Sequence, residues 1–372
     1  MLPVKPFSVR QTVAKEFTNR LSFDGASRPQ EGVCAEKLGF DTTLYRSHPP
    51  ALLKRFGTDP SMEIRRQTVS PSYPAAFSVS TIKPDPRPRI LLESRDGGVK
   101  VLAMALDADS DWMINADGDM VLFSYSGCGR FYTPFGELRV DPMDFVYIPR
   151  GVPYQFQGAA VMAQLFIGIE SSELIQKPDF GPYINADIPY SDQDLQVPIP
   201  FSVLTSSDDE WGVWVKRADI WKKAIYQYRP DCLGWRGSVY PFALSVRDIH
   251  PLSAHTKHLD PTAYTVFAAA SGSVSVQAFL PRYLHSLPYY HMGSHDEFLF
   301  LAKPYAARGG IVGAGDATFH PQGFYHGPNP KALEEWQGPQ RVDECAVMFE
   351  SRSPLFPTVL AQELEIPDYR YH

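Results

Sequence analysis

The segment from Gly315 to His326 constrains the fold of this 372-residue chain most strongly. It reads Gly-Asp-Ala-Thr-Phe-His-Pro-Gln-Gly-Phe-Tyr-His, so Pro321 and Gly323 form a Pro-X-Gly unit, with two residues between Gly323 and the final histidine. Proline fixes one backbone dihedral and glycine tolerates left-handed conformations, so this pair predicts a tight turn between two strands. The turn points the imidazole of His326 into the interior of a β-structure.

Two further metal-ligating side chains lie upstream of this turn. His291 and Glu297 are six positions apart, and with His326 they supply two imidazoles and one carboxylate. Brought together on adjacent strands, these groups make the facial triad of non-haem Fe(II) oxygenases, which leaves coordination positions open for substrate and O2. Of the ten histidines only His48 precedes residue 250, so we expect a histidine-ligated metal only in the C-terminal half.

The turn and the upstream residues resemble the two sequence motifs of a cupin barrel. The second motif of that family is Gly, five residues, Pro-X-Gly, two residues and His, which the segment just described matches. The first motif usually contains His-X-His followed by Glu, whereas this chain has His291, Gly293 and Glu297. The missing middle histidine implies three ligands in place of four. The alternative is that these are ordinary strand residues of a jelly roll.

A fainter copy of the pattern lies earlier in the chain. Pro149 and Gly151 repeat the Pro-X-Gly unit, and Tyr154 stands where the histidine ligand stands. Upstream of them, Asp119 is aligned with Glu297, without a preceding histidine. An internal repeat of this kind predicts a mostly β fold of two tandem cupin-type jelly-roll barrels, the first without metal ligands. A coincidental likeness between two β-hairpins is the alternative.

We therefore expect two domains. Residues 1–230 form a β-rich N-terminal domain with an irregular arm and a degenerate cupin barrel, and residues 231–372 form the catalytic, metal-binding cupin barrel. Apolar runs and turn residues predict strands, a short helical turn and a helix. The predicted strands include residues 99–106, 120–123, 136–140 and 145–148; the helical turn is at 171–175 and the helix near 331–336.

Composition excludes several classes of protein. The chain is 44% hydrophobic and 13% aromatic, so it can bury substantial cores without cross-links. Its four cysteines contain no Cys-X-X-Cys, which argues against a thiolate metal site and a disulfide framework and suits a reducing cytoplasm. A net charge of −7 without a basic stripe argues against nucleic-acid binding. We find no leader and no apolar run that would span a bilayer, so we expect no membrane partner.

Short motifs spread over residues 44–350 are similar to those of one known enzyme family. They are Leu44-Tyr-Arg, Asp117-Gly-Asp, Tyr132-Thr-Pro-Phe-Gly, Pro149-Arg-Gly, Asp179-Phe-Gly-Pro, Trp235-Arg-Gly-Ser-Val-Tyr-Pro, Pro288-Tyr-Tyr-His, Asp296-Glu-Phe, His320, His326-Gly-Pro and Met348-Phe-Glu-Ser. This set resembles the homogentisate 1,2-dioxygenases. The resemblance implies a β-rich N-terminal domain, a C-terminal metal-binding barrel and a homo-oligomer, trimeric or hexameric.

The same resemblance implies roles for individual residues. His291, Glu297 and His326 correspond to the ligands of Fe(II), although Mn(II) can occupy the same ligands. His320 corresponds to a histidine that faces the substrate, and we assign it the catalytic role. Tyr305 corresponds to a substrate-contacting tyrosine, and we expect His320 and His326 to contact the substrate as well. The partners implied are a small aromatic substrate and O2.

One position departs from the family. Its Trp-His-Gly motif, whose histidine is the acid–base group, is Trp235-Arg236-Gly237 here. A guanidinium keeps its proton at neutral pH, so it is no general base, but it can bind a carboxylate or phenolate through two parallel hydrogen bonds. We therefore expect Arg236 to bind an anionic group of the substrate and His320 to transfer protons. The alternative is a surface or salt-bridged arginine.

The expected function is that of an Fe(II)-dependent, ring-cleaving dioxygenase. Its substrate would be homogentisate or a closely related 2,5-dihydroxyphenyl acid, and both atoms of O2 would enter the opened product. From homogentisate that product is maleylacetoacetate, within tyrosine and phenylalanine catabolism in the cytoplasm. Two alternatives are the same chemistry on another para-diol, such as gentisate or a substituted hydroquinone, and an oxygen-independent metal-binding cupin.

Overall fold

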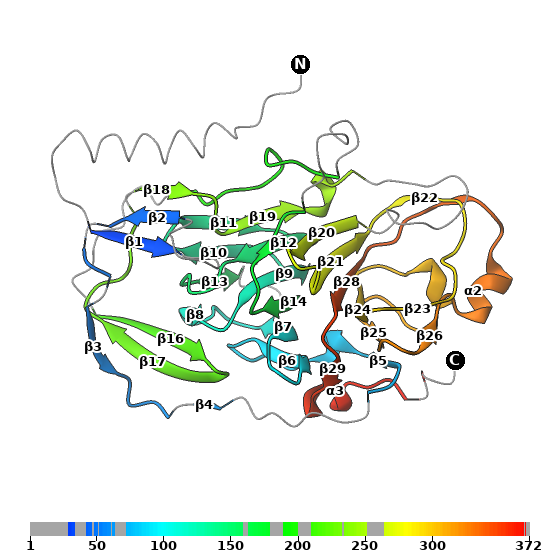
Figure 1. Cartoon of the computed structure of the whole chain (residues 1–372), viewed down its shortest axis with the longest axis horizontal. Helices are drawn as coiled ribbons and strands as arrows, with labels where there is room; N and C mark the ends of the chain where they lie inside the picture. Colours follow the sequence, from blue (N-terminus) through cyan, green and yellow to red (C-terminus); the bar gives the residue numbers. More distant parts are fainter. Residues whose placement is uncertain are drawn as a thin grey trace, which may run out of the picture. The chain divides into compact units, whose positions relative to one another are not determined.

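The computed structural model divides into two compact units that alternate along the chain (Figure 1). The first comprises Met1–Arg65, Leu106–Gln164 and Ser191–Ser245, and the second comprises Arg66–Ala105, Leu165–Tyr190 and Val246–His372. The structure describes residues 29–33, 42–46, 48–50, 52–60, 62–63, 72–158, 163–178, 189–199, 210–232, 234–250, 264–367 and 369. Because the units are discontinuous, they define no single cut point, and the expected boundary near residue 230 stays a prediction.

The first unit is built from short strands. One sheet has the order β1-β2-β18, a second β11-β10-β13, and a third β3-β17-β16-β8 with β4 beside β17; β9, β12 and β19 pair antiparallel. Their bounds are β1 Gln30–Val33, β2 Thr42–Tyr45, β3 Leu53–Phe56, β4 Met62–Glu63, β8 Met113–Asn115, β9 Asp119–Ser126, β10 Gly129–Thr133, β11 Gly136–Val140, β12 Asp144–Ile148, β13 Gln155–Gly158, β16 Trp211–Arg217, β17 Ile220–Tyr226, β18 Gly234–Gly237 and β19 Phe242–Ser245.

The second unit contains the sheet that carries the candidate site. Its strand order is β15-β20-β21-β28-β24-β25-β5, and a further run of paired strands has the order β14-β7-β6-β29. Their bounds are β5 Ala75–Phe77, β6 Arg89–Ser94, β7 Val99–Leu106, β14 Gln164–Ser171, β15 Ile175–Gln176, β20 Tyr264–Ala269, β21 Val274–Phe279, β24 Asp296–Leu301, β25 Ala317–His320, β28 Ala346–Ser351 and β29 Leu355–Pro357.

Two isolated strand pairs and several short helices complete this unit. They are the pair β22 Arg282–Leu284 with β27 Gln340–Val342, the pair β23 His291–Met292 with β26 Tyr325–His326, the 3-10 turns η1 Val79–Thr81, η2 Val246–Asp248 and η3 Ala306–Arg308, and the helices α2 Pro330–Glu335 and α3 Val359–Glu363. Helix α2 begins where Asn329 accepts a hydrogen bond from the Lys331 amide, with proline at the first helical position.

The predicted mostly β fold class is confirmed, since strands dominate the described residues. Strands β7 and β11 cover the predicted ranges 99–106 and 136–140, the other two predicted strands fall within β9 and β12, and α2 begins one residue before the predicted helix. The helical turn predicted for 171–175 is wrong. Ser171 ends β14 and Ile175 begins β15, because the backbone groups here pair with neighbouring strands.

The predicted repeat is present as two antiparallel hairpins, but its alignment needs a correction. In the first hairpin Ile148 faces Met120, and in the second His320 faces Glu297. Each of these pairs lies just before the proline of a Pro-X-Gly turn, so Met120, and not Asp119, is the counterpart of Glu297. The alignment made from sequence was one residue out, and a shift of one residue along a strand exchanges its two faces.

Strand β24 carries the carboxylate and is buried along its whole length, from Asp296 to Leu301. On one face Phe298 stacks against Phe77 and Phe349, with ring centroids 6.2 Å and 6.4 Å away. Glu297 lies on the other face of the strand, together with Leu299 and Leu301. These two leucines pack in a buried hydrophobic cluster with Phe279, Tyr305 and Met348. This packing fixes the position of the Glu297 backbone.

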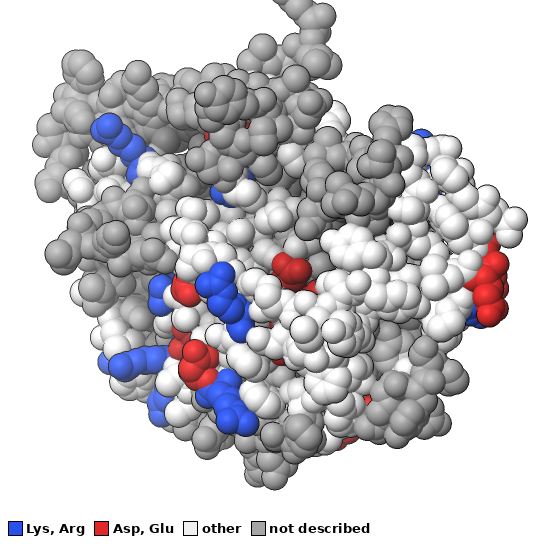
Figure 2. All heavy atoms as spheres, turned by 45° about the vertical axis from the view of Figure 1, so that its right-hand side comes forward, with Lys and Arg blue, Asp and Glu red and all other residues white. Residues whose placement is uncertain are grey.

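Charged residues are interspersed on the face of the molecule shown in Figure 2. Lysines and arginines there lie next to aspartates and glutamates among the described residues. The expectation that the chain does not bind nucleic acid remains a prediction. Among the described residues, the helices are too short or too polar to cross a bilayer.

Candidate metal centre

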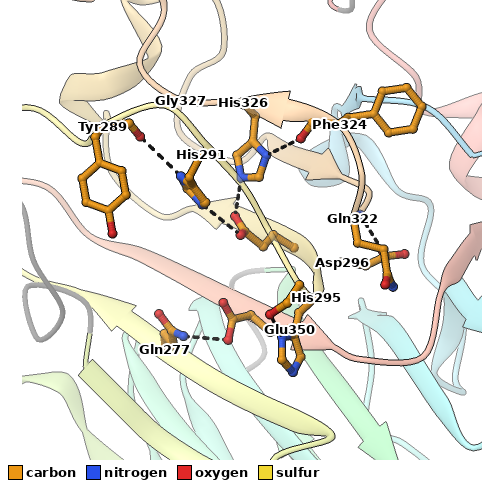
Figure 3. A network of polar contacts seen from close by, with 12 residues as sticks. Gln277, Tyr289, His291, His295, Asp296, Gln322, Phe324, His326, Gly327 and Glu350 are labelled. Atoms are coloured by element: carbon orange, nitrogen blue, oxygen red, sulfur yellow. Dashed lines mark hydrogen bonds and ion pairs between the residues drawn. The ribbon is translucent and has the colours of Figure 1, made fainter.

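The two predicted histidine ligands lie opposite each other on one short strand pair. In the antiparallel pair β23–β26, His291 is the register partner of His326, and their ring centroids are 4.3 Å apart. Glu297 reaches the same point from β24: its Oε1 lies 3.3 Å from His291 Nε2, and its Oε2 lies 3.0 Å from His326 Nε2. In Figure 3 the dashed lines from the His291 and His326 rings meet at one carboxylate, which is that of Glu297. One ligand atom from each residue lies within 4.8 Å of the other two.

The turn between β25 and β26 positions His326. Gly323 has a φ of 88°, in the left-handed region that side chains avoid, so the glycine of the motif meets a backbone requirement. Asp296 fixes the same turn, because its Oδ1 accepts hydrogen bonds from the backbone N of Gln322 at 2.8 Å and from its Nε2 at 3.1 Å. Its Oδ2 accepts from the Leu355 amide at 2.6 Å. Figure 3 shows the contact with Gln322 beside the site.

Backbone carbonyls determine which nitrogen of each imidazole faces the carboxylate. His291 Nδ1 lies 3.3 Å from the Tyr289 carbonyl oxygen, and His326 Nδ1 lies 3.2 Å from that of Phe324. A contact with a carbonyl oxygen requires a proton on Nδ1, which leaves a lone pair on Nε2 of a neutral ring. That lone pair can bind a cation, which would take the place of the Nε2 hydrogen bonds to Glu297. The donor set therefore fits a divalent metal ion.

The carboxylate is held in its ionised form. Burial of Glu297 favours the neutral acid, but hydrogen bonds with His291 and His326 outweigh it and hold the pKa of Glu297 well below its usual range. Glu297 and His326 are buried, whereas 38% of the His291 side chain is exposed. An anionic carboxylate with one exposed imidazole makes a site that a metal ion can enter from solvent.

His320 lies beside the candidate ligands and not among them. Its ring stacks on that of His326, with centroids 4.6 Å apart and 9° between the planes. Its Nε2 is 3.2 Å from the Tyr369 hydroxyl, and its buried Nδ1 has no hydrogen-bond partner within the described residues. Burial first, and then the positive charge of Arg308, keep the pKa of His320 well below its usual value. The imidazole is therefore neutral at pH 7 and keeps an available lone pair.

Tyr305 is buried in the wall of a cavity that contains all three candidate ligands. This cavity, which we call the ligand cavity, has a volume of about 260 Å³ and is lined also by Phe279, Arg308, Met348 and Glu350. The Tyr305 ring packs edge-on against Phe279, with centroids 5.3 Å apart. Burial raises the pKa of its hydroxyl, and the charge of Glu344 raises it further, so Tyr305 stays a hydrogen-bond donor at neutral pH.

Arg236 lies in the first unit, whereas the candidate ligands lie in the second. It is exposed on β18, where its register partner is Thr43 of β2. Its expected role toward the substrate stays a prediction.

Sequence reasoning missed two residues at this site. Arg308 lies three positions after Tyr305 and lines the ligand cavity, and Tyr369 contacts His320. The spacing of Tyr305 and Arg308, followed by Gly309-Gly310, is compatible with a single tight turn that directs both side chains to one side. The hydroxyl of Tyr369 lies 49 residues beyond His320, and no local pattern links the two.

The chain is similar in sequence to proteins whose names describe them as dioxygenases. A protein of Saccharolobus solfataricus named "Putative dioxygenase" is 33% identical over 272 residues, 68% of each chain. Homogentisate 1,2-dioxygenase of Sinorhizobium medicae is 28% identical over 291 residues, 72% of this chain and 63% of that enzyme. That of Rhizobium rhizogenes is 28% identical over 279 residues, 70% of this chain and 61% of the enzyme. The chain thus spans less than two thirds of the length of these two homogentisate dioxygenases.

A solved cupin 2 conserved barrel domain protein from Leptotrichia buccalis is similar over 77% of this chain and 99% of its own, with 8% identity and a TM-score of 0.40. Two family models cover most of the chain. The one described as Homogentisate 1,2-dioxygenase N-terminal matches residues 93–246, and the one described as Homogentisate 1,2-dioxygenase C-terminal matches residues 250–372. The chain belongs to the homogentisate 1,2-dioxygenase family.

Proposed function

We propose that this protein is an Fe(II)-dependent dioxygenase that opens the ring of homogentisate or a closely related 2,5-dihydroxyphenyl acid. The observation that carries the proposal is the convergence of His291 Nε2, His326 Nε2 and the Glu297 carboxylate in one cavity. Two imidazoles and one carboxylate are the ligand set of non-haem iron oxygenases, and they leave positions open for two further molecules. Membership of the homogentisate 1,2-dioxygenase family supports the ring-cleaving reaction.

Each residue of the site has a defined part in this proposal. His291, Glu297 and His326 would hold the metal, and an iron ion bound there supplies the binding and activation of O2. Tyr305 donates a hydrogen bond to the substrate from the cavity wall. We assign proton transfer to His320, whose neutral imidazole keeps a lone pair at pH 7 and is oriented by the Tyr369 hydroxyl next to its Nε2. Both oxygen atoms enter the product as one ring carbon–carbon bond breaks; from homogentisate the product is maleylacetoacetate.

A second candidate substrate class follows from Arg236, which stands where the family has histidine. The same chemistry on another para-diol, such as gentisate or a substituted hydroquinone, agrees with a changed substrate contact at that position. A trimeric or hexameric assembly remains an expectation from the family resemblance, and a cytoplasmic location remains an expectation from the cysteine content. Mn(II) remains an alternative to Fe(II), because it can occupy the same ligands.

The proposal is tested by O2 uptake. Protein loaded anaerobically with Fe(II) is mixed with homogentisate, gentisate or hydroquinone, and a His326→Ala variant serves as the control. We expect rapid uptake with at least one acid and none in the variant. Uptake with gentisate alone would move the assignment to the second substrate class. No uptake with any of the three would contradict the dioxygenase and favour an oxygen-independent cupin.

A further inference from the structure

We propose that Arg308 is the residue that binds the carboxylate of the aromatic acid, a role that rests on the function proposed above. Arg308 ends the 3-10 turn η3, and its exposed fraction is 9%. It lines the ligand cavity together with Tyr305, whose ring centroid is 5.8 Å from the guanidinium carbon. One turn of chain therefore presents a phenol and a guanidinium to the same space.

The hydrogen bonds of Arg308 leave its charge uncompensated. Its Nη1 donates to the carbonyl oxygen of Gly327 at 3.1 Å, and its Nη2 donates to the Thr318 hydroxyl at 3.4 Å. Both acceptors are neutral. Its buried Nε has no hydrogen-bond partner within the described residues. A buried cation without an anion is unfavourable, and a ligand carboxylate would supply both the missing charge and the missing acceptor.

The other buried cations of the described residues show the contrast. Each has a carboxylate partner within ion-pair distance, whereas no such pair is found for Arg308 among the described side chains. The pairs are Lys100 with Glu170, Lys216 with Asp219, Arg282 with Glu344 and Arg46 with Glu31. Arg282 is the closest parallel, since it lies in the same unit and its Nη1 is 2.6 Å from Glu344 Oε1. Arg308 thus differs from the structural pattern of this protein.

The carboxylates that share the cavity have other partners. Glu297 faces the two histidines, and Glu350 accepts a hydrogen bond from Gln277 Nε2 at 2.7 Å and another from the Ser275 hydroxyl. Figure 3 shows Glu350 and Gln277 paired with each other. Arg308 also lines a neighbouring cavity of about 300 Å³ with His320 and His326. Arg308 therefore borders two cavities, and of these two the ligand cavity is the one that contains all three candidate ligands.

The test compares an acid with its neutral ester. Homogentisate and methyl homogentisate are titrated anaerobically, by calorimetry, into metal-loaded protein with and without Arg308→Met. Losing a hydrogen bond to a charged group weakens binding by about 10- to 100-fold. We expect that loss for homogentisate and less than about a threefold change for the ester. Arg308→Lys, which keeps the charge, should retain part of the preference for the acid.

Two controls separate this role from a structural one. Arg341 is exposed on β27, so Arg341→Met removes an arginine from the same unit and should leave both affinities unchanged. Metal content and the thermal midpoint report whether the Gly327 contact, next to His326, has been disturbed. An equal loss of affinity for acid and ester, or an unchanged affinity for the acid, would overturn the proposal, and so would a wild-type protein that binds no acid.

The outcome is distinguishable from failure of the dioxygenase proposal. Arg308-dependent binding of the acid without O2 uptake would preserve the carboxylate site and reject ring cleavage. Conversely, O2 uptake with homogentisate that Arg308→Met leaves intact would preserve the reaction and reject the carboxylate site.

Discussion

The two hairpins of the repeat have nearly the same backbone and opposite chemistry. Asp119 and Asp296 each begin a strand, and each accepts a hydrogen bond at 2.8 Å from the middle residue of the following Pro-X-Gly turn. The turn glycines, Gly151 and Gly323, have φ values of 78° and 88°. The turn architecture is therefore independent of a metal.

The side chains at the equivalent positions differ in kind. The strand register relates four positions of the two hairpins. The second hairpin has, in order, His291, Glu297, His320 and His326, and the first has Met113, Met120, Ile148 and Tyr154 at the corresponding positions. These four are buried, and the Tyr154 hydroxyl is 3.9 Å from the Met113 sulfur. In the first hairpin these side chains pack against one another in the core. In the second hairpin His291, Glu297 and His326 are polar and line a cavity.

The largest expected difference between the hairpins is in metal binding. His326→Ala should lower bound Fe(II) from about one per chain to below about 0.1 and O2 uptake by more than about 100-fold, since losing a second-shell partner alone costs 10- to 100-fold. The matched change in the first hairpin, Tyr154→Phe, should leave metal content near wild type. Metal analysis of the two purified variants makes the comparison. Loss of metal in Tyr154→Phe would show that the first hairpin also contributes to the metal site.

This comparison also shows what the sequence could and could not predict. The Pro-X-Gly turns were predictable because glycine and proline have backbone requirements that do not depend on the rest of the fold. Strand β7, Val99–Leu106, was predictable because an apolar run of that length has few other structures available.

Register and long-range contacts were not predictable. Asp119 was aligned with Glu297 because both are acidic, but pairing of Met120 with Ile148 shows that the similarity of charge was misleading. Arg308 was missed because its significance lies in an absent carboxylate partner, and ion pairs such as that of Arg282 with Glu344 join residues 62 positions apart. Information of this kind depends on the folded arrangement.

We expect the next largest effect, a loss of stability, when a charge is placed in the first hairpin. Met120→Glu puts a carboxylate at the counterpart of Glu297, where no imidazole compensates it, and we expect a loss of roughly 3–5 kcal/mol in the free energy of unfolding. Met120→Leu, a swap of similar volume, should cost less than about 1.5 kcal/mol. Urea unfolding followed by tryptophan fluorescence measures both. Wild-type stability of Met120→Glu would mean that water reaches this position.

The two aspartates should differ in how well they tolerate an amide. In Asp296→Asn the new amide group must face either the Gln322 or the Leu355 backbone N–H, both of which only donate, so we expect a loss of about 1–3 kcal/mol. Asp119 accepts from the Tyr147 hydroxyl, which can rotate and become the acceptor. Asp119→Asn should therefore cost about 1 kcal/mol or less in the same urea experiment. Equal losses would indicate that the phenol cannot turn.

The smallest effect concerns a residue with positive φ that lies just before the second strand of each hairpin. Gly315, with φ 89°, donates its N–H to Leu301 O at 2.7 Å, and Met143, with φ 74°, donates to Ser124 O at the same distance. A side chain in this region costs about 1–2 kcal/mol, so Gly315→Ala should lower the free energy of unfolding by about 1 kcal/mol. Met143→Gly should raise it by less, because the relieved strain is partly offset by the greater freedom of glycine in the unfolded chain. Chemical unfolding of the pair should give opposite signs. If both substitutions destabilise the protein, the packing of the Met143 side chain outweighs the strain of its backbone, and the first hairpin depends on side-chain packing even at its turn.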